Sequence, residues 1–358
     1  MRARLVAVAL LTATIGTSGC GGRQADWLEA ARPAEHGFPG DLSRRIDSFV
    51  GENDLDLRAV LVVADDRLVA ERYYHGVTRG RFLHLYSATK SVTGLLAGIA
   101  LTEGKLTGLD EPLAQALPPK LAARASGRIR AMTLRGLLSM TTGLGEELSW
   151  LTSADFARAI VENPFFAGPP GSFSYSTEGT QLVGAAIEHA TEGTLLRYAA
   201  KKLFEPLGMV TEPRGEGHPG PGHETEPTFG WAHDSRGHYL AGAGLRLRGI
   251  DMAKLGLLYL HRGEWEGRRV VPRSWIDAAT RPHSDGGFPE NAPYGFLTWL
   301  PTEHGRRAFL MAGFGGQYIE VVPSLRLVIV TSSPTRPSFA TRAMLTYIVG
   351  LAGRSPTI

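Results

Sequence analysis

Ser87 and Lys90, a serine and a lysine three residues apart, are the pair of side chains in this sequence best suited to nucleophilic catalysis. Positions i and i+3 share one face of a helix, so the two side chains can meet if a helix begins at Ser87. A serine hydroxyl alone is a poor nucleophile, and a neighbouring base must take its proton. Lysine can be that base when burial lowers its pKa. The pair therefore predicts acyl transfer through a serine nucleophile.

The residues around Lys90 favour a buried amine. The spacing alone is weak evidence, because Ser87 could be a helix N-cap and Lys90 could lie on a solvated face. After Lys90, however, come the apolar and small residues SVTGLLAGIAL, and the next charged residue is Glu103. Most of the positive charge of the chain is arginine, which does not give up its proton in proteins. A lysine three residues after a serine is therefore stronger evidence for a catalytic base here than it would be in a lysine-rich protein.

The predicted elements place strands at both ends of the chain and helices between them. Hydrophobic periodicity and turn residues predict strands over 59–64, 68–74, 294–300, 308–312, 317–322 and 327–332, and helices over 40–50, 87–102, 154–161, 180–190, 195–204, 251–260 and 338–351. Strands that follow one another through short turns form antiparallel sheets. We therefore expect an α/β (α+β) fold: a mainly antiparallel sheet, flanked by N- and C-terminal helices, with an inserted, mostly helical domain. The expected boundaries are 40–108 and 240–353 for the sheet domain and 109–239 for the insertion.

The N-terminus predicts export. Arg2 and Arg4 precede an apolar stretch over 5–15, and small residues then lead to Cys20, so residues 1–19 are typical of a signal peptide. Cys20 is the single cysteine of the chain, which rules out an intramolecular disulfide. Its place resembles a bacterial lipoprotein box, although Thr17 stands where leucine is usual. We expect a lipidated Cys20, a tether over 20–39 and a periplasmic or cell-envelope location; the alternative is an ordinary cleaved signal with an incidental cysteine.

The overall composition argues against nucleic-acid and metal-dependent function. The net charge is +3, and there is no run of clustered basic residues with interleaved aromatics, so no nucleic-acid partner is expected. His218, His223, His233 and His238 match no recognised zinc spacing, so no metal is expected. No organic cofactor is implied either, and the phosphate-binding glycine loop is absent. The Gly-x-Ser-x-Gly elbow of α/β-hydrolases is absent as well.

Several ordered motifs carry a family resemblance. The stretch LYSATKS, followed by GLLAGIALTEGKLTGLDEPL, resembles the nucleophile helix of serine β-lactamases, especially class C enzymes and their esterase relatives. The stretch TLRGLLSMTTGL over 133–144 is similar to the family segment that leads into the helical domain. GTQLVG, GAGLRLRGIDMAKLGLLYLHRGEW, YGFLTWL and AGFGGQYIEVVP resemble the 6-aminohexanoate-dimer hydrolase branch. The resemblance runs from about residue 40 to residue 350 and implies a β-lactamase/transpeptidase-like fold with Ser87 and Lys90 in the active site.

The segment PGSFSYST over 170–177 occupies the place of the family's Tyr-x-Asn box. The resemblance gives Tyr175 the role of relaying protons to the nucleophile and the leaving group; the alternative is a packed core tyrosine. Thr177 stands where asparagine is usual and is expected to contribute to substrate binding. Trp231, Tyr294 and Trp299 could line a substrate cleft or pack in the core.

This chain departs from the family pattern at the third motif, which is Lys/His-Thr/Ser-Gly on a sheet strand. Its place is taken by Met311-Ala312-Gly313-Phe314-Gly315-Gly316, which contains no cation. In the family that cation helps to hold a substrate carboxylate, so its loss argues against both β-lactamase and DD-peptidase activity. His304, Arg306 and Arg307 lie just upstream and could lend charge or form a solvated turn. Backbone N–H groups of Ser87 and of one residue among Phe314, Gly315 and Gly316 are candidate oxyanion donors; the alternative for the glycines is simple turn geometry.

The sequence as a whole predicts an exported serine hydrolase that cleaves ester or amide bonds through an acyl-enzyme. A carboxylesterase or small-amide hydrolase is favoured, and β-lactamase or DD-peptidase activity is the alternative. A third possibility is a non-catalytic envelope protein of the same fold that binds peptidoglycan-like ligands. The expected partners are a small ester or amide substrate and, through Cys20, a membrane. The oligomeric state is left open.

Overall fold

The computed structural model describes residues 30–215, 225–334 and 340–353. The signal peptide expected over 1–19 and the candidate lipidation site Cys20 lie outside the described residues. From Ala30 onward the chain packs against the body of the protein: the Ala31 N–H donates to the Leu68 carbonyl at 2.9 Å, and Phe38 is buried. Among the described residues, no helix is both long enough and apolar enough to cross a bilayer.

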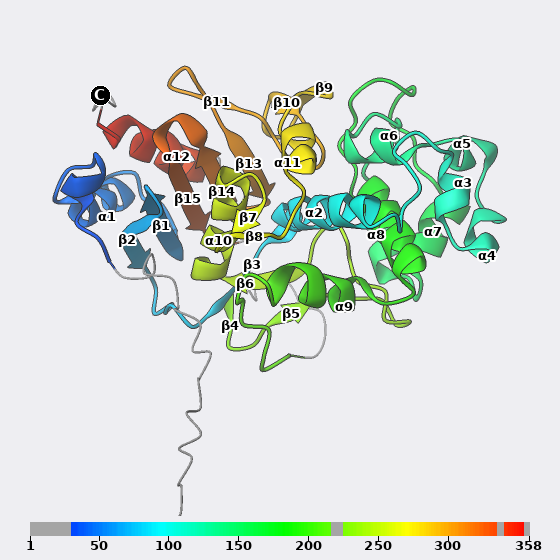
Figure 1. The fold of residues 1–358 in the computed structure, drawn as a ribbon, viewed down its shortest axis with the longest axis horizontal. Helices are drawn as coiled ribbons and strands as arrows, with labels where there is room; N and C mark the ends of the chain where they lie inside the picture. The colour runs from blue at the N-terminus through cyan, green and yellow to red at the C-terminus, as the bar shows by residue number, and fades with distance from the viewer. Residues whose placement is uncertain (1–29, 216–224, 335–339, 354–358) are drawn as a thin grey trace, which may run out of the picture.

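A five-stranded sheet takes its strands from both ends of the chain (Figure 1). The strand order is β13-β14-β15-β1-β2, and every neighbouring pair is antiparallel. Between β1 and β2 the chain turns at Asp65 and Asp66, which have φ angles of 48° and 65°, the left-handed geometry that two-residue hairpin turns require. The predicted, mainly antiparallel sheet is confirmed. Its strands are β1 (Ala59–Ala64), β2 (Arg67–Tyr73), β13 (Phe309–Gly313), β14 (Gln317–Val322) and β15 (Leu327–Ser332).

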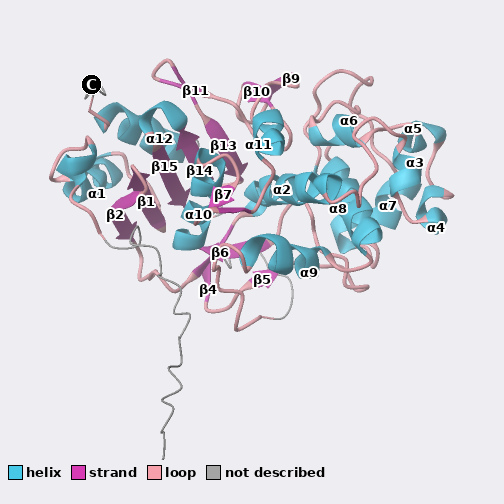
Figure 2. Ribbon diagram, in the orientation of Figure 1, coloured by secondary structure: helices cyan, strands magenta, loops and turns pink. Residues whose placement is uncertain are grey.

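Helices cover both faces of this sheet (Figures 1 and 2). Helices α1 (Leu42–Glu52) and α12 (Ala340–Leu351) lie against one face, and α10 (Gly249–Leu260) lies against the other. All six residues of β1 are buried, and its sequence AVLVVA is apolar throughout instead of alternating. A strand covered on both faces needs apolar side chains on both, which explains the uninterrupted pattern.

Glu320, on β14, is an acidic residue buried in this otherwise apolar sheet interior. It is fully buried, and neither carboxylate oxygen has a hydrogen-bond partner in the described part of the chain. Burial, reinforced by the negative charges of Glu303 and Glu290, raises its pKa to about 8 against the attraction of Arg342. An acid whose folded-state pKa exceeds its unfolded value makes the folded state less stable as pH rises through that interval.

Glu320→Gln is therefore expected to flatten the pH dependence of stability. From pH 5 to pH 9 the wild-type protein should lose stability as the Glu320 carboxyl ionises, by about 4 kcal/mol, whereas a glutamine side chain in its place cannot ionise. Thermal unfolding at a series of pH values measures this difference. Glu303→Gln is the contrasting variant, because the Glu303 carboxylate accepts a hydrogen bond from Arg342 and its replacement should cost stability at every pH. Parallel curves for wild type and Glu320→Gln would contradict the assignment.

A second, four-stranded sheet, in the order β4-β3-β6-β5, lies below the first in Figure 1. Short two-stranded hairpins decorate the surface. The smaller strands are β3 (Phe82–His84), β4 (Thr225–Glu226), β5 (Gly230–Trp231), β6 (Leu245–Arg248), β7 (Glu264–Trp265), β8 (Arg268–Arg269), β9 (Ser284–Gly287), β10 (Ala292–Tyr294), β11 (Thr302–Glu303) and β12 (Arg306–Arg307).

Most of the remaining helices gather on the side away from the five-stranded sheet, and α2 and α11 lie between them and the sheet (Figure 2). The remaining helices are α2 (Thr89–Thr102), α3 (Leu113–Ala116), α4 (Pro119–Ala122), α5 (Gly127–Arg130), α6 (Leu134–Leu138), α7 (Phe156–Glu162), α8 (Thr177–Thr191), α9 (Leu195–Ala199) and α11 (Arg273–Ala279). Short turns of helix occur at Pro33–His36, Tyr86–Ala88, Leu148–Thr152, Ala200–Phe204 and Pro323–Leu325. Most of these lie in the stretch where the inserted helical region was expected.

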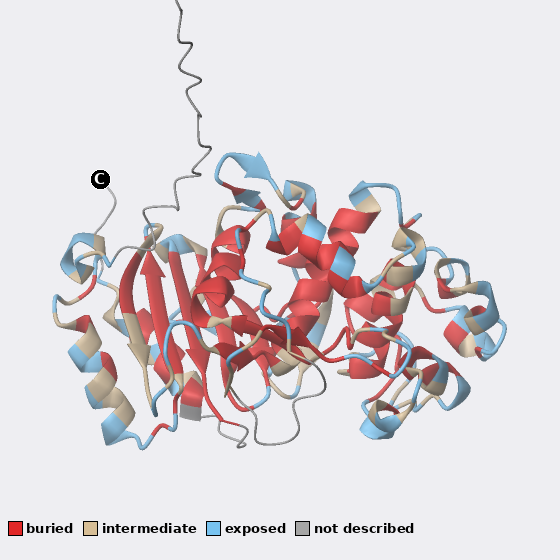
Figure 3. Cartoon of the chain, turned by 90° about the horizontal axis from the view of Figure 1, so that it is seen from below, coloured by how far each residue is buried: buried red, intermediate tan, exposed pale blue. Residues whose placement is uncertain are grey.

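Helix α2 runs through the middle of the molecule and is buried from Thr89 to Ala100 (Figure 3). It packs against α8 and α11, and a Cβ atom on Gly98 would lie 2.1 Å from the indole of Trp275. The small residues of α2 thus let neighbouring elements approach it closely on several sides. This packing explains why the sequence around Lys90 contains almost no charge.

One predicted strand is wrong. Residues 294–300 were expected to form an extended strand, but β10 ends at Tyr294 and the following residues form an irregular turn in which Leu297 has a φ of 52°. The Leu297 N–H donates to the Leu138 carbonyl at 2.9 Å, and Trp299 pairs with Leu310 through an isolated bridge. The segment is apolar because it is buried between elements and not because it belongs to a ladder.

Candidate active site

Ser87 lies on a tight turn between β3 and α2. Residues Tyr86–Ala88 form a turn of 3-10 helix, and the α-helix begins only at Thr89, two residues later than expected. Tyr86 has a φ of 45°, an uncommon backbone geometry for a bulky residue. The Tyr86 N–H donates to the His84 ring at 3.0 Å, and the Leu85 N–H donates to the Leu245 carbonyl of β6 at 2.9 Å. These hydrogen bonds hold the turn so that it presents Ser87 at the start of a buried helix.

Lys90 is buried, with 1% of its surface exposed, and its amine has three acceptors. Its Nζ atom lies 2.9 Å from Ser87 Oγ, 2.9 Å from Thr177 Oγ1 and 3.0 Å from the Gly242 carbonyl oxygen. An ammonium has three donors, so this shell can satisfy all of them. Burial lowers the Lys90 pKa to about 8, against the attraction of Glu146 and Glu178. A lysine with this pKa can take and return a proton near neutral pH.

Tyr175 comes from the segment that precedes α8 and meets the same two side chains. Its phenol interacts with the Ser87 hydroxyl, and Lys90 Nζ lies 4.8 Å from the centre of its ring. Burial raises its pKa, so the phenol stays protonated when it is at rest. The ring stacks on Trp299, with 5.7 Å between centroids, and Tyr294 packs against both rings. The structure thus brings Ser87, Lys90 and Tyr175 together.

The aromatic residues considered for a substrate cleft are buried. Tyr294 and Trp299 hold the Tyr175 ring in place, with 1% and 2% of their surfaces exposed. Trp231, also buried, donates from its indole N–H to the Leu240 and Ala243 carbonyls at 2.9 and 3.2 Å. It thereby fixes the loop whose Gly242 carbonyl accepts from Lys90. These aromatic side chains therefore hold Tyr175 and the Gly242 loop in place.

Thr177 has a different set of contacts from those expected of a substrate-binding residue. Its hydroxyl accepts from Lys90 Nζ and donates to the Glu146 carboxylate, so both contacts are to the protein. Thr177 is the first residue of α8, and the Ser176 side chain caps that helix by accepting from the Gly179 N–H at 2.9 Å. A Cβ atom on Gly242 would lie 2.7 Å from the Thr177 methyl group, so the glycine allows the close approach.

Two carboxylates near Lys90 were not predicted from the sequence. Glu146 is exposed, whereas Glu178 is buried and accepts from the Trp150 indole N–H at 3.0 Å and from the Glu147 N–H. Burial raises the pKa of Glu178. Glu178 follows Thr177 in the sequence, which offers a weak signal, but Glu146 lies 31 residues away from Thr177, in GLGEEL, and has no motif spacing that would have revealed it.

The end of β13 passes directly against the turn that carries Ser87. A Cβ atom on Gly313 would lie 2.1 Å from the Leu85 carbonyl oxygen and 3.2 Å from the Ala88 nitrogen. Gly315 and Gly316 have φ angles of 82° and 98°, so they shape the turn from β13 to β14. Their carbonyls accept from Ser333 and Thr331. The Gly316 N–H donates to the Gly313 carbonyl at 3.2 Å, so among the three predicted candidates Phe314 and Gly315 remain for the second oxyanion donor, and Phe314 directly follows the contact.

Gly313→Ala is expected to reduce catalysis without unfolding the protein. The added methyl group collides with backbone atoms that cannot move aside as a flexible side chain would, so β13 must shift away from the nucleophile turn. Because oxyanion stabilisation is sensitive to displacements of this size, kcat/KM should fall by about 100-fold. Circular dichroism provides the folding control. Gly80→Ala is the matched variant, since no atom lies within 4 Å of its Cβ position and its φ is outside the left-handed region. Unchanged kinetics in Gly313→Ala would contradict the contact.

No cation takes the place of the missing family lysine or histidine among the described residues near β13. Met311 and Ala312 are buried in the strand. His304 contacts the Thr346 carbonyl at 2.9 Å, and Arg306 donates to the His304 carbonyl at 3.3 Å. Arg307 lies over the ring of Phe309. These three basic residues belong to the β11–β12 hairpin, and their contacts are with that hairpin, β13 and α12.

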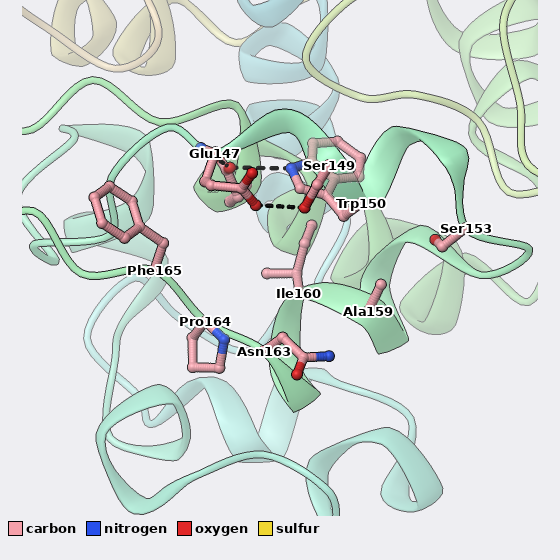
Figure 4. A pocket seen from close by; sticks show the side chains of 10 residues that line it. Glu147, Ser149, Trp150, Ser153, Ala159, Ile160, Asn163, Pro164 and Phe165 are labelled. Carbon is pink, nitrogen blue, oxygen red and sulfur yellow. Dashed lines mark hydrogen bonds between the residues drawn. The ribbon is translucent and has the colours of Figure 1, made fainter.

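A separate cavity of about 240 Å³ is lined in part by Glu178 (Figure 4). It is lined by Glu147, Ser149, Trp150, Ser153, Ala159, Ile160, Asn163, Pro164, Phe165 and Glu178. Glu147 lines this cavity, whereas the preceding Glu146 contacts Thr177. Ser87, Lys90 and Tyr175 do not line it. Within the described residues, no group of three or more His, Cys, Asp or Glu side chains could hold a metal ion.

The sequence matches a known protein family over most of its length. A family model described as Beta-lactamase matches residues 28–353, which is most of the sequence. The chain belongs to the beta-lactamase family. The family includes penicillin-binding proteins, and the expected resemblance is confirmed. No curated protein matches the chain.

Solved structures show the same beta-lactamase fold at low sequence identity. A candidate 6-aminohexanoate-dimer hydrolase from Bacillus anthracis is 21% identical, with a TM-score of 0.68 over 85% of this chain and 81% of that one. An octameric penicillin-binding protein homologue from Pyrococcus abyssi is 20% identical, with a TM-score of 0.65 over 87% and 77%. A β-lactamase from Mycobacterium bovis is 20% identical, with a TM-score of 0.60 over 86% and 99%. The beta-lactamase fold is consistent with serine hydrolase activity.

Proposed function

We propose that the protein is a serine hydrolase that cleaves ester or small-amide bonds through an acyl-enzyme on Ser87. The observation that carries the proposal is the buried Lys90 amine, 2.9 Å from Ser87 Oγ and with a pKa lowered to about 8. At pH 7 about one Lys90 side chain in ten is then neutral and able to accept a proton. A lysine with a pKa this close to neutrality, in contact with a serine hydroxyl, is the arrangement that activation of a serine nucleophile requires.

In the first half of the reaction, the Ser87 proton moves to the neutral Lys90 amine as Ser87 Oγ attacks the carbonyl carbon. The oxyanion accepts hydrogen bonds from the N–H groups of Ser87 and Phe314. Tyr175, whose phenol interacts with the Ser87 hydroxyl, passes a proton to the leaving alcohol or amine and regains one from Lys90. In the second half, water attacks the acyl-enzyme and gives its proton to the same pair, which restores Ser87.

The expected substrate preference follows from the charges of the residues near Ser87. Met311 and Ala312 occupy the position where the family uses a cation to hold a carboxylate, and Glu146 adds negative charge near Lys90. β-Lactams and D-Ala-D-Ala peptides both carry a carboxylate close to the scissile bond. A carboxylesterase or small-amide hydrolase therefore fits the site better than a β-lactamase or DD-peptidase.

A substrate panel tests the proposal. Purified protein is incubated with p-nitrophenyl butyrate, p-nitrobutyranilide, nitrocefin and a peptide ending in D-Ala-D-Ala, and kcat/KM is measured for each. The ester or anilide should be the best substrate. Turnover of nitrocefin faster than that of the ester would favour β-lactamase activity instead. A fluorophosphonate probe should label the protein, and absence of both labelling and turnover would favour a non-catalytic, ligand-binding role.

Export and lipidation form a second proposal, carried by the arginines, the apolar stretch and Cys20 at the N-terminus. Expression of the full chain in a bacterium fed an alkyne-labelled fatty acid should give a labelled, membrane-associated protein. Cys20→Ala should lose the fatty-acid label completely. A wild-type protein that is exported without label would show an ordinary cleaved signal, and one retained in the cytoplasm would contradict the proposal.

A further inference from the structure

His84, the last residue of β3, places a buried imidazole beside the turn that carries Ser87. Only 8% of its surface is exposed, and its Nδ1 atom accepts a hydrogen bond from the Tyr86 N–H at 3.0 Å. A backbone N–H can only donate, so Nδ1 must keep its lone pair, and the proton of the neutral ring then lies on Nε2. The contact therefore requires a neutral imidazole in one particular tautomer.

A buried arginine next to His84 opposes protonation of the ring. Arg246 lies directly across from His84 in the β3–β6 ladder and is 4% exposed. Its Nε atom has no hydrogen-bond partner among the described residues, and its ion pair with Glu226 of β4 spans 3.8 Å. Burial, reinforced by the positive charge of Arg246, lowers the His84 pKa to about 4. At neutral pH the ring is therefore an acceptor for the Tyr86 N–H.

The hydrogen bond from Tyr86 fixes the direction of both functional groups of Ser87. Tyr86 has a φ of 45°, a sparsely populated geometry that persists only where surrounding contacts hold it. The His84 ring also packs on the Tyr86 ring, with 4.0 Å between centroids. The peptide that joins Tyr86 to Ser87 carries the Ser87 N–H, a proposed oxyanion donor. Rotation of the backbone at Tyr86 would move this N–H and the Ser87 hydroxyl together.

The Tyr86 ring also contacts the segment that follows β13. It meets the Phe314 ring edge-on, with 6.1 Å between centroids. Phe314 follows Gly313, whose Cβ position lies 3.2 Å from the Ala88 nitrogen on the nucleophile turn. A displacement of Tyr86 would therefore disturb the nucleophile turn and the β13–β14 turn, the two segments that carry the proposed oxyanion donors.

We infer that His84 is a positioning residue for the nucleophile: by accepting the Tyr86 N–H, its neutral ring holds the turn that directs the Ser87 hydroxyl and N–H toward the substrate carbonyl. This inference rests on the proposed hydrolase function. It also gives the buried Arg246 a part in the reaction, because a cation at that place disfavours a protonated ring, which could not accept. His84 acts through Tyr86 and needs no contact with the substrate.

Two substitutions of similar shape separate hydrogen bonding from packing. Asparagine and leucine both branch at Cγ, but asparagine can place an accepting oxygen there, where histidine has Nδ1. His84→Leu should lower kcat/KM for p-nitrophenyl butyrate and the rate of fluorophosphonate labelling, each by about 50-fold, because the turn loses its alignment. His84→Asn should keep both rates within about fivefold of wild type. A merely structural histidine predicts the reverse order, since leucine suits a buried site better than asparagine.

His304→Leu is the matched control. The His304 ring also bonds to a backbone group, the Thr346 carbonyl at 2.9 Å, but it lies in the turn between β11 and β12, so both rates should stay at the wild-type level. Thermal unfolding checks the fold of each variant. NMR of wild-type protein with isotope-labelled histidine needs no variant to fold. The ring in contact with the Tyr86 amide should remain the neutral Nε2–H tautomer from about pH 8 to about pH 5.

The outcomes distinguish the inference from the proposed function. Wild-type rates in His84→Leu, or equal losses in His84→Leu and His84→Asn, would overturn the role of His84 while leaving the hydrolase intact. An Nδ1–H tautomer, or a ring that titrates near the ordinary value of about 6.5, would overturn it as well. Failure of the wild type both to hydrolyse the ester and to react with the probe would overturn the proposed function together with this inference.

Discussion

Ser87→Ala is expected to lower kcat/KM for p-nitrophenyl butyrate by about 10,000-fold and to abolish labelling by a fluorophosphonate. The substitution removes the atom that forms the acyl-enzyme, and the remaining oxyanion donors can only assist direct attack by water. Stability should change little, because the Ser87 hydroxyl lies at a partly open turn and not in the core. Steady-state kinetics and gel fluorescence measure the two effects.

Two comparisons make this result specific. Ser172→Ala removes an exposed hydroxyl in the segment leading to Tyr175 and should retain full labelling and activity. Thermal unfolding of both variants shows that the fold is kept. Persistent labelling of Ser87→Ala would mean that another serine is the nucleophile, and the assignment of the whole cluster would then be wrong.

Replacement of Lys90 should have the second largest effect. Lys90→Met removes the proton acceptor and is expected to lower kcat/KM by about 1,000-fold, within the range that general-base catalysis contributes. Lys90→Arg should be almost as inactive, because a guanidinium keeps its proton at all accessible pH values. A merely structural, charged Lys90 would be tolerated better as arginine than as methionine. Comparison of the two variants therefore distinguishes a base from a structural cation.

The pH profile gives an independent test of Lys90. The active form is the neutral amine, so wild-type kcat/KM should rise with pH and level off above about 8, the pKa of the buried amine. Glu146→Gln removes a negative charge that raises this pKa, so its profile should shift toward lower pH. A profile that is flat between about pH 6 and pH 9, measured with a neutral ester, would show that no group with this pKa controls the reaction.

Local patterns predicted the elements well where one physical cause determined them. The hairpin β1–β2 follows from two strand-forming runs around a polar turn, and β14 and β15 lie at the residues expected from their apolar runs and flanking turns. The segment 294–300 was predicted wrongly because burial among helices and burial in a sheet select the same apolar residues. Likewise, the 3-10 turn at Tyr86 depends on hydrogen bonds to His84 and β6 that no local pattern records.

The sequence by itself determined which residues could react. A serine and a lysine one helical turn apart, followed by an uncharged helix, identify a nucleophile with a desolvated base, because spacing and burial are both readable from local sequence. Only the tertiary structure decided what surrounds that amine. The Thr177 hydroxyl, the Gly242 carbonyl and the Glu146 carboxylate come from segments far apart in the chain, and their contacts with the site depend on how α2, α8 and two loops pack. The charge that a substrate meets therefore follows from packing and not from spacing.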